Sequence, residues 1–167
     1  YVDSSAKIQK AIAIVVNAKT QRPGVCNALE SLFVHQKIAK PFLTKLVPIL
    51  VEQNVEIRGD QTVKKLFPKV KKAKESDYAE EYLDLILSIK TVSNIEDAIQ
   101  NIQKVTSGHT ESIITESKKN ASEFIRSLNS SCVMVNTSTR FNDGGELGLG
   151  AEIGISTTKL HAYGPMG

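Results

Sequence analysis

Segments whose apolar residues recur every three to four positions alternate with short, continuous apolar runs along this chain. The first kind predicts helices with one buried face, and the second predicts buried strands. The predicted helices cover residues 5–19, 38–54, 60–66, 95–105 and 121–128. The predicted strands cover residues 29–35, 55–58, 83–92, 112–115 and 132–135. Because strands that alternate with helices form parallel sheets, we expect an α/β fold: a mostly parallel or mixed sheet flanked by helices on both faces.

Three local features refine this prediction. Residues 29–35 are compatible with a buried strand or with the start of a helix, and we favour the strand. Pro48 predicts a kink in the second helix, whereas Asp60 and Asn94 are expected to cap the third and fourth. Five of the 10 glycines lie between Gly144 and Gly154, which predicts ordered loops in place of regular structure there.

Composition limits the classes of protein to consider. The 167 residues predict a single domain, and no apolar run reaches the ~18 residues that a spanning helix requires. A net charge of +3 argues against nucleic-acid binding, and the run of lysines between Lys64 and Lys74 is expected to be a solvated surface. The three histidines lack the spacing of a metal site, so no metal is expected. Two cysteines favour a reduced, cytoplasmic setting, and both chain ends look cut from a longer protein.

Cys26 is the candidate nucleophile. A reactive thiolate needs exposure and positive surroundings, which the loop at Pro23 and Gly24 and the nearby Lys19 and Arg22 are expected to supply. Cys132 lies within an apolar strand and is expected to be inert. The Gly148-Leu149-Gly150 sequence does not fit a dinucleotide fingerprint, because no strand precedes it.

Four spaced motifs resemble one family. They are Gln-Arg-Pro-Gly-Val-Cys-Asn-Ala-Leu-Glu (21–30), Ser-Gly-His-Thr-Glu-Ser-Ile (107–113), Val-Asn-Thr-Ser-Thr-Arg-Phe-Asn-Asp-Gly (135–144) and Gly-Leu-Gly-Ala-Glu-Ile-Gly-Ile-Ser-Thr (148–157). Together they are similar to the gamma-glutamyl phosphate reductases of the aldehyde dehydrogenase superfamily. The resemblance implies that residues 1–167 are a catalytic domain, and that the NADPH-binding domain is absent from this sequence.

The resemblance also implies a reaction. That family reduces L-glutamyl 5-phosphate with NADPH to the 5-semialdehyde and phosphate, in proline biosynthesis. Cys26 matches the family's nucleophile, which forms a thioester, and its backbone N–H is a plausible oxyanion donor worth ~3 kcal/mol. Glu81 aligns with the superfamily glutamate that contacts the nicotinamide-side ribose. The alternative is that Glu81 is a polar residue leading into a strand.

Arg140 is the candidate substrate-binding residue. It follows the last predicted strand, where α/β sheets gather ligand-binding loops. Its guanidinium can bind a carboxylate or phosphate with two parallel hydrogen bonds, and the Ser138 hydroxyl could add a third. In the alternative interpretation, Arg140 pairs with Asp143 or Glu146 and stabilises the glycine-rich segment.

Two other functions remain open. The chain could be the reductase half of a bifunctional pyrroline-5-carboxylate synthase, or a noncatalytic α/β oligomerisation module. For the reductase, the expected partners are a small-molecule substrate, further copies of the chain in a homo-oligomer and, through functional coupling, glutamate 5-kinase. Neither nucleic acid nor a membrane is an expected partner.

Overall fold

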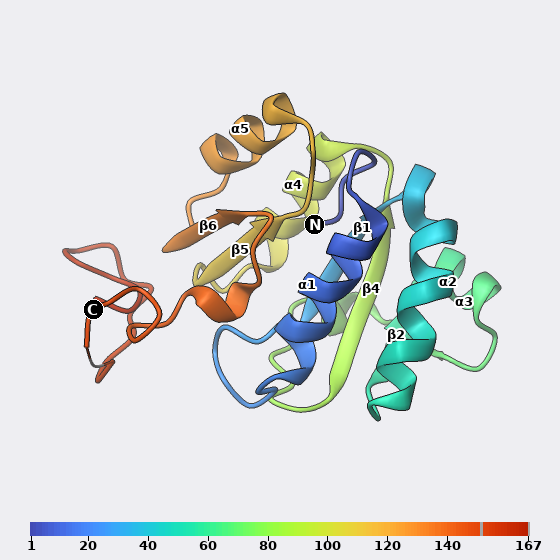
Figure 1. Cartoon of the computed structure of the whole chain (residues 1–167), viewed down its shortest axis with the longest axis horizontal. Helices are drawn as coiled ribbons and strands as arrows, with labels where there is room; N and C mark the ends of the chain where they lie inside the picture. Colours follow the sequence, from blue (N-terminus) through green and yellow to red (C-terminus); the bar gives the residue numbers. More distant parts are fainter. Residues whose placement is uncertain (151, 167) are drawn as a thin grey trace.

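Two parallel sheets form the framework of the computed structural model, which describes residues 1–150 and 152–166. The larger sheet has the order β1-β4-β2-β3, and β5 pairs with β6 in the smaller one (Figure 1). The strands are β1 (Ser31–His35), β2 (Glu56–Gly59), β3 (Lys71–Lys72), β4 (Ile86–Val92), β5 (Thr110–Ile113) and β6 (Cys132–Val135). The helices are α1 (Ile8–Thr20), α2 (Gln36–Glu52), α3 (Gln61–Leu66), α4 (Ile95–Val105) and α5 (Lys118–Ser127), with short 3-10 turns η1 (Glu75–Tyr78) and η2 (Thr139–Phe141).

The first three residues join the two sheets. On one side, the Val2 N–H donates to the Phe33 carbonyl, and the Val2 carbonyl accepts from the His35 N–H, both at 2.9 Å. On the other side, the Ile114 N–H donates to the Tyr1 carbonyl at 2.8 Å, and the Asp3 N–H donates to the Ile114 carbonyl at 3.0 Å. Parallel pairing therefore continues from β6 to β3 through an extended segment at Val2.

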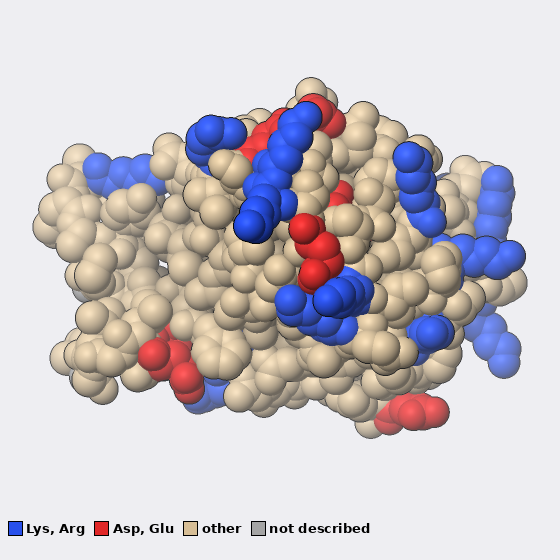
Figure 2. Space-filling view, turned by 45° about the horizontal axis from the view of Figure 1, so that its top comes forward, with Lys and Arg blue, Asp and Glu red and all other residues tan. Residues whose placement is uncertain are grey.

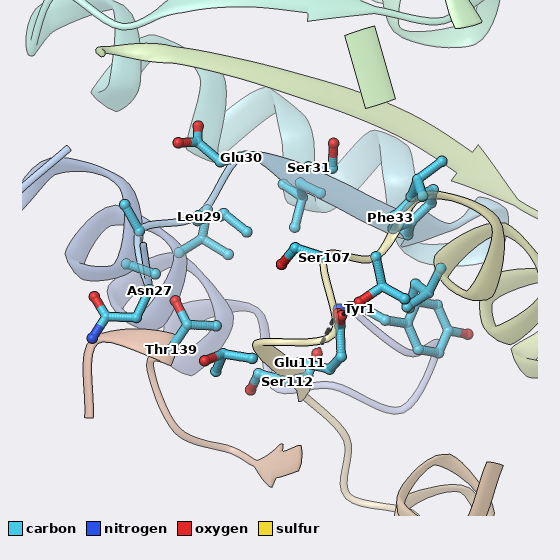
Figure 3. A pocket seen from close by; sticks show the side chains of 18 of the residues that line it. Tyr1, Asn27, Leu29, Glu30, Ser31, Phe33, Ser107, Glu111, Ser112 and Thr139 are labelled. Atoms are coloured by element: carbon cyan, nitrogen blue, oxygen red, sulfur yellow. Dashed lines mark hydrogen bonds between the residues drawn. The ribbon is translucent and has the colours of Figure 1, made fainter. Parts of the chain in front are cut away.

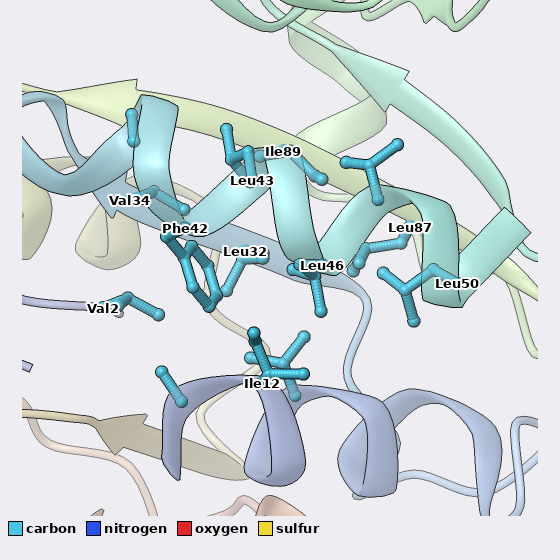
Figure 4. Close-up of a cluster of buried hydrophobic side chains, with 14 of the residues drawn as sticks. Val2, Ile12, Leu32, Val34, Phe42, Leu43, Leu46, Leu50, Leu87 and Ile89 are labelled. Atoms are coloured by element: carbon cyan, nitrogen blue, oxygen red, sulfur yellow. The ribbon is translucent and has the colours of Figure 1, made fainter. Parts of the chain in front are cut away.

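Side chains of β1 alternate between two hydrophobic cores, one on each face of the sheet. Leu32 and Val34 pack with Val2 and with apolar residues of α1, α2 and α3 (Figure 4). Phe33 points to the opposite face and packs with apolar residues of α4 and α5. Helices thus cover both faces of a parallel sheet, so the predicted α/β architecture is confirmed.

Two predicted strand boundaries are wrong, for local reasons. The strand expected from residue 83 begins at Ile86, because Leu83 has a left-handed backbone with φ of 52°. The strand expected over 112–115 covers Thr110–Ile113: it begins at Thr110, which pairs with Cys132 of β6, and ends at Ile113, because Ile114 pairs with Tyr1 and Asp3 instead.

Several helix and strand predictions agree closely with the structure. Asn94 accepts a hydrogen bond from the Asp97 N–H and caps α4, and Asp60 caps α3 through the Val63 N–H, both at 2.8 Å. Residues 29–35 contain strand β1, although Leu29 and Glu30 precede it. The predicted helix 121–128 begins earlier, at Lys118. Strand β6 is half-buried, contrary to the buried strand that its apolar sequence predicted, because it is an edge strand.

Charged side chains of both signs lie close together on the surface. Most of the lysines between Lys64 and Lys74 are exposed, as predicted, and Lys71 pairs with Glu56 at 2.5 Å. On the face in Figure 2, Lys and Arg occur singly or in small groups, several of them beside Asp or Glu. The glycine-rich C-terminal segment forms the loops that lie apart from both sheets in Figure 1. In the described residues, no helix is both long and apolar enough to span a membrane.

A buried carboxylate fixes the segment that joins the sheets. Asp3 is 1% exposed and accepts hydrogen bonds from the hydroxyls of Ser5 and Thr115, at 2.6 and 2.8 Å. Its other oxygen accepts from the Asn120 amide at 3.0 Å. Burial alone would raise the pKa of Asp3, but the hydrogen bonds from these side chains hold that pKa below its ordinary value. Ionised Asp3 therefore stabilises the fold at neutral pH.

We expect Asp3→Asn to lower the free energy of unfolding by about 2–3 kcal/mol, because an amide replaces an acceptor-only group among donors. The melting temperature should fall by about 5–10 °C, measured by circular dichroism. Since the folded-state pKa of Asp3 lies below its unfolded value, the stability it contributes is lost as pH falls below about 4. The difference between wild type and variant should shrink there; a difference independent of pH would contradict this role.

Candidate active site

The loop between α1 and β1 presents Cys26 to solvent. Turns at Pro23-Gly24 and Cys26-Asn27 shape this loop, and the Leu29 N–H donates to the Ala18 carbonyl at 2.9 Å to fix its end. Cys26 is exposed, as the turn-forming sequence predicted. It lines a cavity of about 160 Å³ that reaches from this loop to β5 and the end of α4 (Figure 3).

The positive surroundings expected of Cys26 are only partly present. Lys19 is fully buried and its Nζ donates to Glu30 Oε2 at 2.7 Å, so this charge is neutralised away from the thiol. Burial and the carboxylates of Glu152 and Glu81 raise the pKa of the Cys26 thiol, and the charge of Arg140 opposes them. The prediction that Lys19 supplies a positive environment is therefore wrong; Arg140 supplies positive charge near the thiol, but burial and the two carboxylates outweigh it.

Cys132 occupies a different environment. It is the first residue of β6 and half-buried, and burial raises its pKa. It is not among the described residues that line the cavity. The two cysteines are thus separated by location, with Cys26 alone facing the cavity.

A chain reversal after β6 brings Arg140 to Cys26. Asn136 has a left-handed backbone with φ of 58°, and its side-chain amide bonds both backbone groups of Thr115. The chain then runs back along β5: the Ser112 hydroxyl donates to the Thr137 carbonyl at 2.7 Å, and the Asn142 amide donates to the Thr110 hydroxyl at 2.7 Å. Arg140 therefore lies toward the amino end of β5, not at the carboxyl ends of the strands as expected.

Asn27 connects this returning segment to the loop that carries Cys26. Its Oδ1 accepts a hydrogen bond from the Arg140 guanidinium, and its amide nitrogen donates to the Asn142 carbonyl at 2.9 Å. The Arg140 Nε donates to Gln21 Oε1 at 3.2 Å. The residue after Cys26 is therefore held by the same segment that supplies the arginine.

The alternative expected for Arg140 does not occur. No salt bridge joins it to Asp143 or Glu146 within residues 1–150 and 152–166. The Ser138 hydroxyl accepts the Arg140 N–H at 3.3 Å and caps η2, and Ser138 is buried. Ser138 therefore orients the turn that carries Arg140, and a direct contact of its hydroxyl with substrate stays a prediction.

Glu81 lies in the same cavity as Cys26. Its carboxylate is exposed, and the charged side chains that line this cavity are all glutamates: Glu30, Glu80, Glu81 and Glu111. Such a lining accepts hydrogen bonds from hydroxyl groups. In the described part of the chain, no group of three His, Cys, Asp or Glu side chains is placed to hold a metal.

Sequence reasoning missed two residues of this cavity. Thr139 points into it (Figure 3), and its hydroxyl is buried without a hydrogen-bond partner. Glu111 is also in the lining; its carboxylate accepts hydrogen bonds from Thr106 and Ser130, and burial raises its pKa. Both lie within the motifs 107–113 and 135–144, but the motifs alone did not single them out, because each reaches the cavity only through the reversal after β6 or the position of β5.

Comparison with known proteins defines the class of this fold and site. The sequence profile of the aldehyde dehydrogenase family matches residues 66–150. An acetylating aldehyde dehydrogenase from Geobacillus thermoglucosidasius shares the fold, with a TM-score of 0.67 at 21% identity over 95% of this chain and 43% of its own. The chain belongs to the aldehyde dehydrogenase family.

Within that family, the chain is most clearly similar to gamma-glutamyl phosphate reductases. The one from Caldanaerobacter subterraneus subsp. tengcongensis is 56% identical over 100% of this chain and 40% of its own length. The crystal structure of the Thermotoga maritima protein of that name is 52% identical, with a TM-score of 0.97 over 99% of this chain and 40% of its own. The chain thus spans about 40% of the length of the curated relatives it matches.

We expect the pH dependence of Cys26 alkylation to report these charges. In this chain with Cys132→Ala, the iodoacetamide rate should rise with pH around a midpoint above the ordinary thiol value of about 8.5. Arg140→Gln should move the midpoint upward and Glu152→Gln downward, because they remove opposite charges. Glu52→Gln, an exposed site at the end of α2, is the control and should change nothing. A midpoint below 8.5, or equal shifts in both variants, would contradict this assignment.

Proposed function

We propose that residues 1–167 are the catalytic domain of an NADPH-dependent gamma-glutamyl phosphate reductase. The observation that carries the proposal is an exposed Cys26 on a cavity that also contains Glu81, within a fold whose 56% identical relative has that name. The family's name supports an acyl phosphate as substrate, and this substrate class suits a cysteine that has no basic side chain beside it in the cavity lining.

Cys26 performs the first chemical step. Its thiolate attacks the carbonyl carbon of the acyl phosphate, a carbon–sulfur bond forms, and the carbon–oxygen bond to phosphate breaks. Phosphate leaves with the electron pair of that bond, and the product is a thioester on Cys26. Phosphate is a good leaving group, so this step needs no activated water and no general acid at the leaving oxygen. We infer that the backbone N–H of Cys26 donates to the oxyanion that develops at the carbonyl.

Cys26 also performs the last step. NADPH, when bound, supplies the hydride that reduces the thioester. The carbon–sulfur bond then breaks, Cys26 leaves as the thiolate, and the semialdehyde is released. Arg140 supports both steps, because its charge favours the thiolate of Cys26.

Glu81 fits the sugar end of a nicotinamide cofactor. Its carboxylate is exposed on the cavity that contains Cys26, and a carboxylate accepts hydrogen bonds from ribose hydroxyls. The described residues contain no strand, glycine-rich loop and helix unit that would bind the cofactor's phosphates, so we infer that a part of the enzyme outside residues 1–167 binds them. The homo-oligomer, the coupling to glutamate 5-kinase and the cytoplasmic location stay predictions.

The decisive test is substitution of each cysteine in a full-length protein that contains this chain. Cys26→Ala should abolish NADP⁺ reduction with glutamate 5-semialdehyde and phosphate, because the other cysteine, Cys132, does not line the cavity. Cys132→Ala should leave the rate largely unchanged and serves as the matched control. Substantial activity of the Cys26 variant would overturn the mechanism, and inactivity of the wild type would favour a noncatalytic module.

We further expect the isolated 167-residue chain to bind NADPH with a dissociation constant weaker than about 1 mM. It contributes Glu81 as an acceptor for the ribose hydroxyls, but residues 1–150 and 152–166 contain no unit of strand, glycine-rich loop and helix that would bind the phosphates. Isothermal calorimetry of the folded chain should show no saturable heat. A full-length protein should bind NADPH in the same buffer. Tight binding of NADPH to the isolated chain would contradict the inference that the cofactor's phosphates are bound outside residues 1–167.

A further inference from the structure

A second, more polar cavity lies against the start of the loop that carries Cys26. It measures about 120 Å³ and is lined by Asn17, Gln21, Arg140, Phe141, Asp143 and Glu146. These residues come from the end of α1 and from the segment that returns after β6. Arg140 links the two cavities, because its guanidinium also bonds Asn27, which lines the larger one beside Cys26.

Several polar atoms in this second cavity have hydrogen-bonding capacity left over. Asn17 Oδ1 is buried without a partner. The Arg140 bonds to Asn27 and Gln21 use Nη1 and Nε, and no bond of Nη2 is found among the described residues. Asp143 Oδ1 accepts the Gly145 N–H at 2.9 Å, which leaves Oδ2 available, and Glu146 is exposed. Buried polar groups are nearly always bonded, so unused groups that converge on a cavity indicate a polar ligand.

The charges of this cavity indicate which ligand it fits. One guanidinium and two carboxylates line it without a salt bridge joining them in the described structure, so each charge remains available to a ligand. A phosphate would meet two carboxylates of its own sign, which costs free energy in a partly enclosed site. A zwitterion presents one charge of each sign and matches the lining.

We propose that Asn17, Arg140, Asp143 and Glu146 bind the α-amino-acid end of the substrate. The α-carboxylate contacts the Arg140 guanidinium, and the α-ammonium donates to the carboxylates of Asp143 and Glu146 and to Asn17 Oδ1. The side chain of the substrate then extends past Asn27 and delivers its terminal carbonyl to Cys26. This inference rests on the proposed function and adds to it the recognition of both α-substituents.

The test uses two aldehydes that differ only in the α-amino group: L-glutamate 5-semialdehyde and 5-oxopentanoate. In a full-length protein that contains this chain, kcat/KM is measured in the phosphate-dependent, NADP⁺-reducing direction. The key variant is Asp143→Asn with Glu146→Gln. Asparagine keeps the oxygen that accepts the Gly145 N–H, so the turn is preserved. Each variant is compared with wild type on the same substrate, which cancels differences in the fraction of free aldehyde.

The double variant should lower kcat/KM for the amino-bearing aldehyde by about tenfold or more, because a charge-assisted hydrogen bond is lost. With 5-oxopentanoate it should lose less than about threefold. Arg140→Gln should lower kcat/KM for both, since both contain the carboxylate. Glu52→Gln is the control variant, and melting temperatures verify folding.

The possible failures are distinguishable. If wild type is active and Cys26→Ala is not, but the double variant loses the same factor with both aldehydes, the amino-acid subsite is wrong and the reductase assignment stands. If wild type does not oxidise the semialdehyde, the proposed function itself is wrong. A double variant that retains full kcat/KM with the semialdehyde also overturns the subsite.

Discussion

Backbone pairing at Val2 is the interaction on which the rest of this structure depends. The Val2 N–H and carbonyl both bond β1, and the adjacent Tyr1 and Asp3 bond Ile114, so one short extended segment joins a four-stranded sheet to a two-stranded one. The buried carboxylate of Asp3 then bonds Ser5, Thr115 and Asn120. Because β5 and β1 are held at this fixed spacing, the cavity between them has walls contributed by both sheets.

The site is assembled by loops at the amino side of these strands. Cys26 precedes β1, Thr110 begins β5, and the reversal at Asn136 returns Thr139 and Arg140 to the same region. Asn27 connects the pieces by bonding both Arg140 and Asn142. The loop that carries Cys26 and the segment that carries Arg140 therefore belong to one hydrogen-bonded unit, although more than a hundred residues separate them in the chain.

How far the sequence predicts this molecule depends on the range of the interactions. Caps such as Asp60 and Asn94 act within three residues, so α3 and α4 were predicted closely. The end of β5 was misplaced because Ile114 takes its partners from residues 1–3, a long-range pairing that no local pattern contains. Cys26 could be found from its motif and turn residues. The buried state of Lys19 and the position of Arg140 could not, since each depends on tertiary packing.

The two hydrogen bonds of the Asn27 side chain have a consequence for the length of the acyl chain that can react. Its amide accepts from a guanidinium and donates to a carbonyl, so it can neither flip nor shift without losing both bonds. These bonds fix the distance between the loop that carries Cys26 and the Arg140 side chain. An acyl chain one methylene shorter or longer would change length by about 1.3 Å, enough to displace its carbonyl from the attacking sulfur. Chain-length selectivity would then follow from the rigidity of the loop, and not from the shape of the cavity wall.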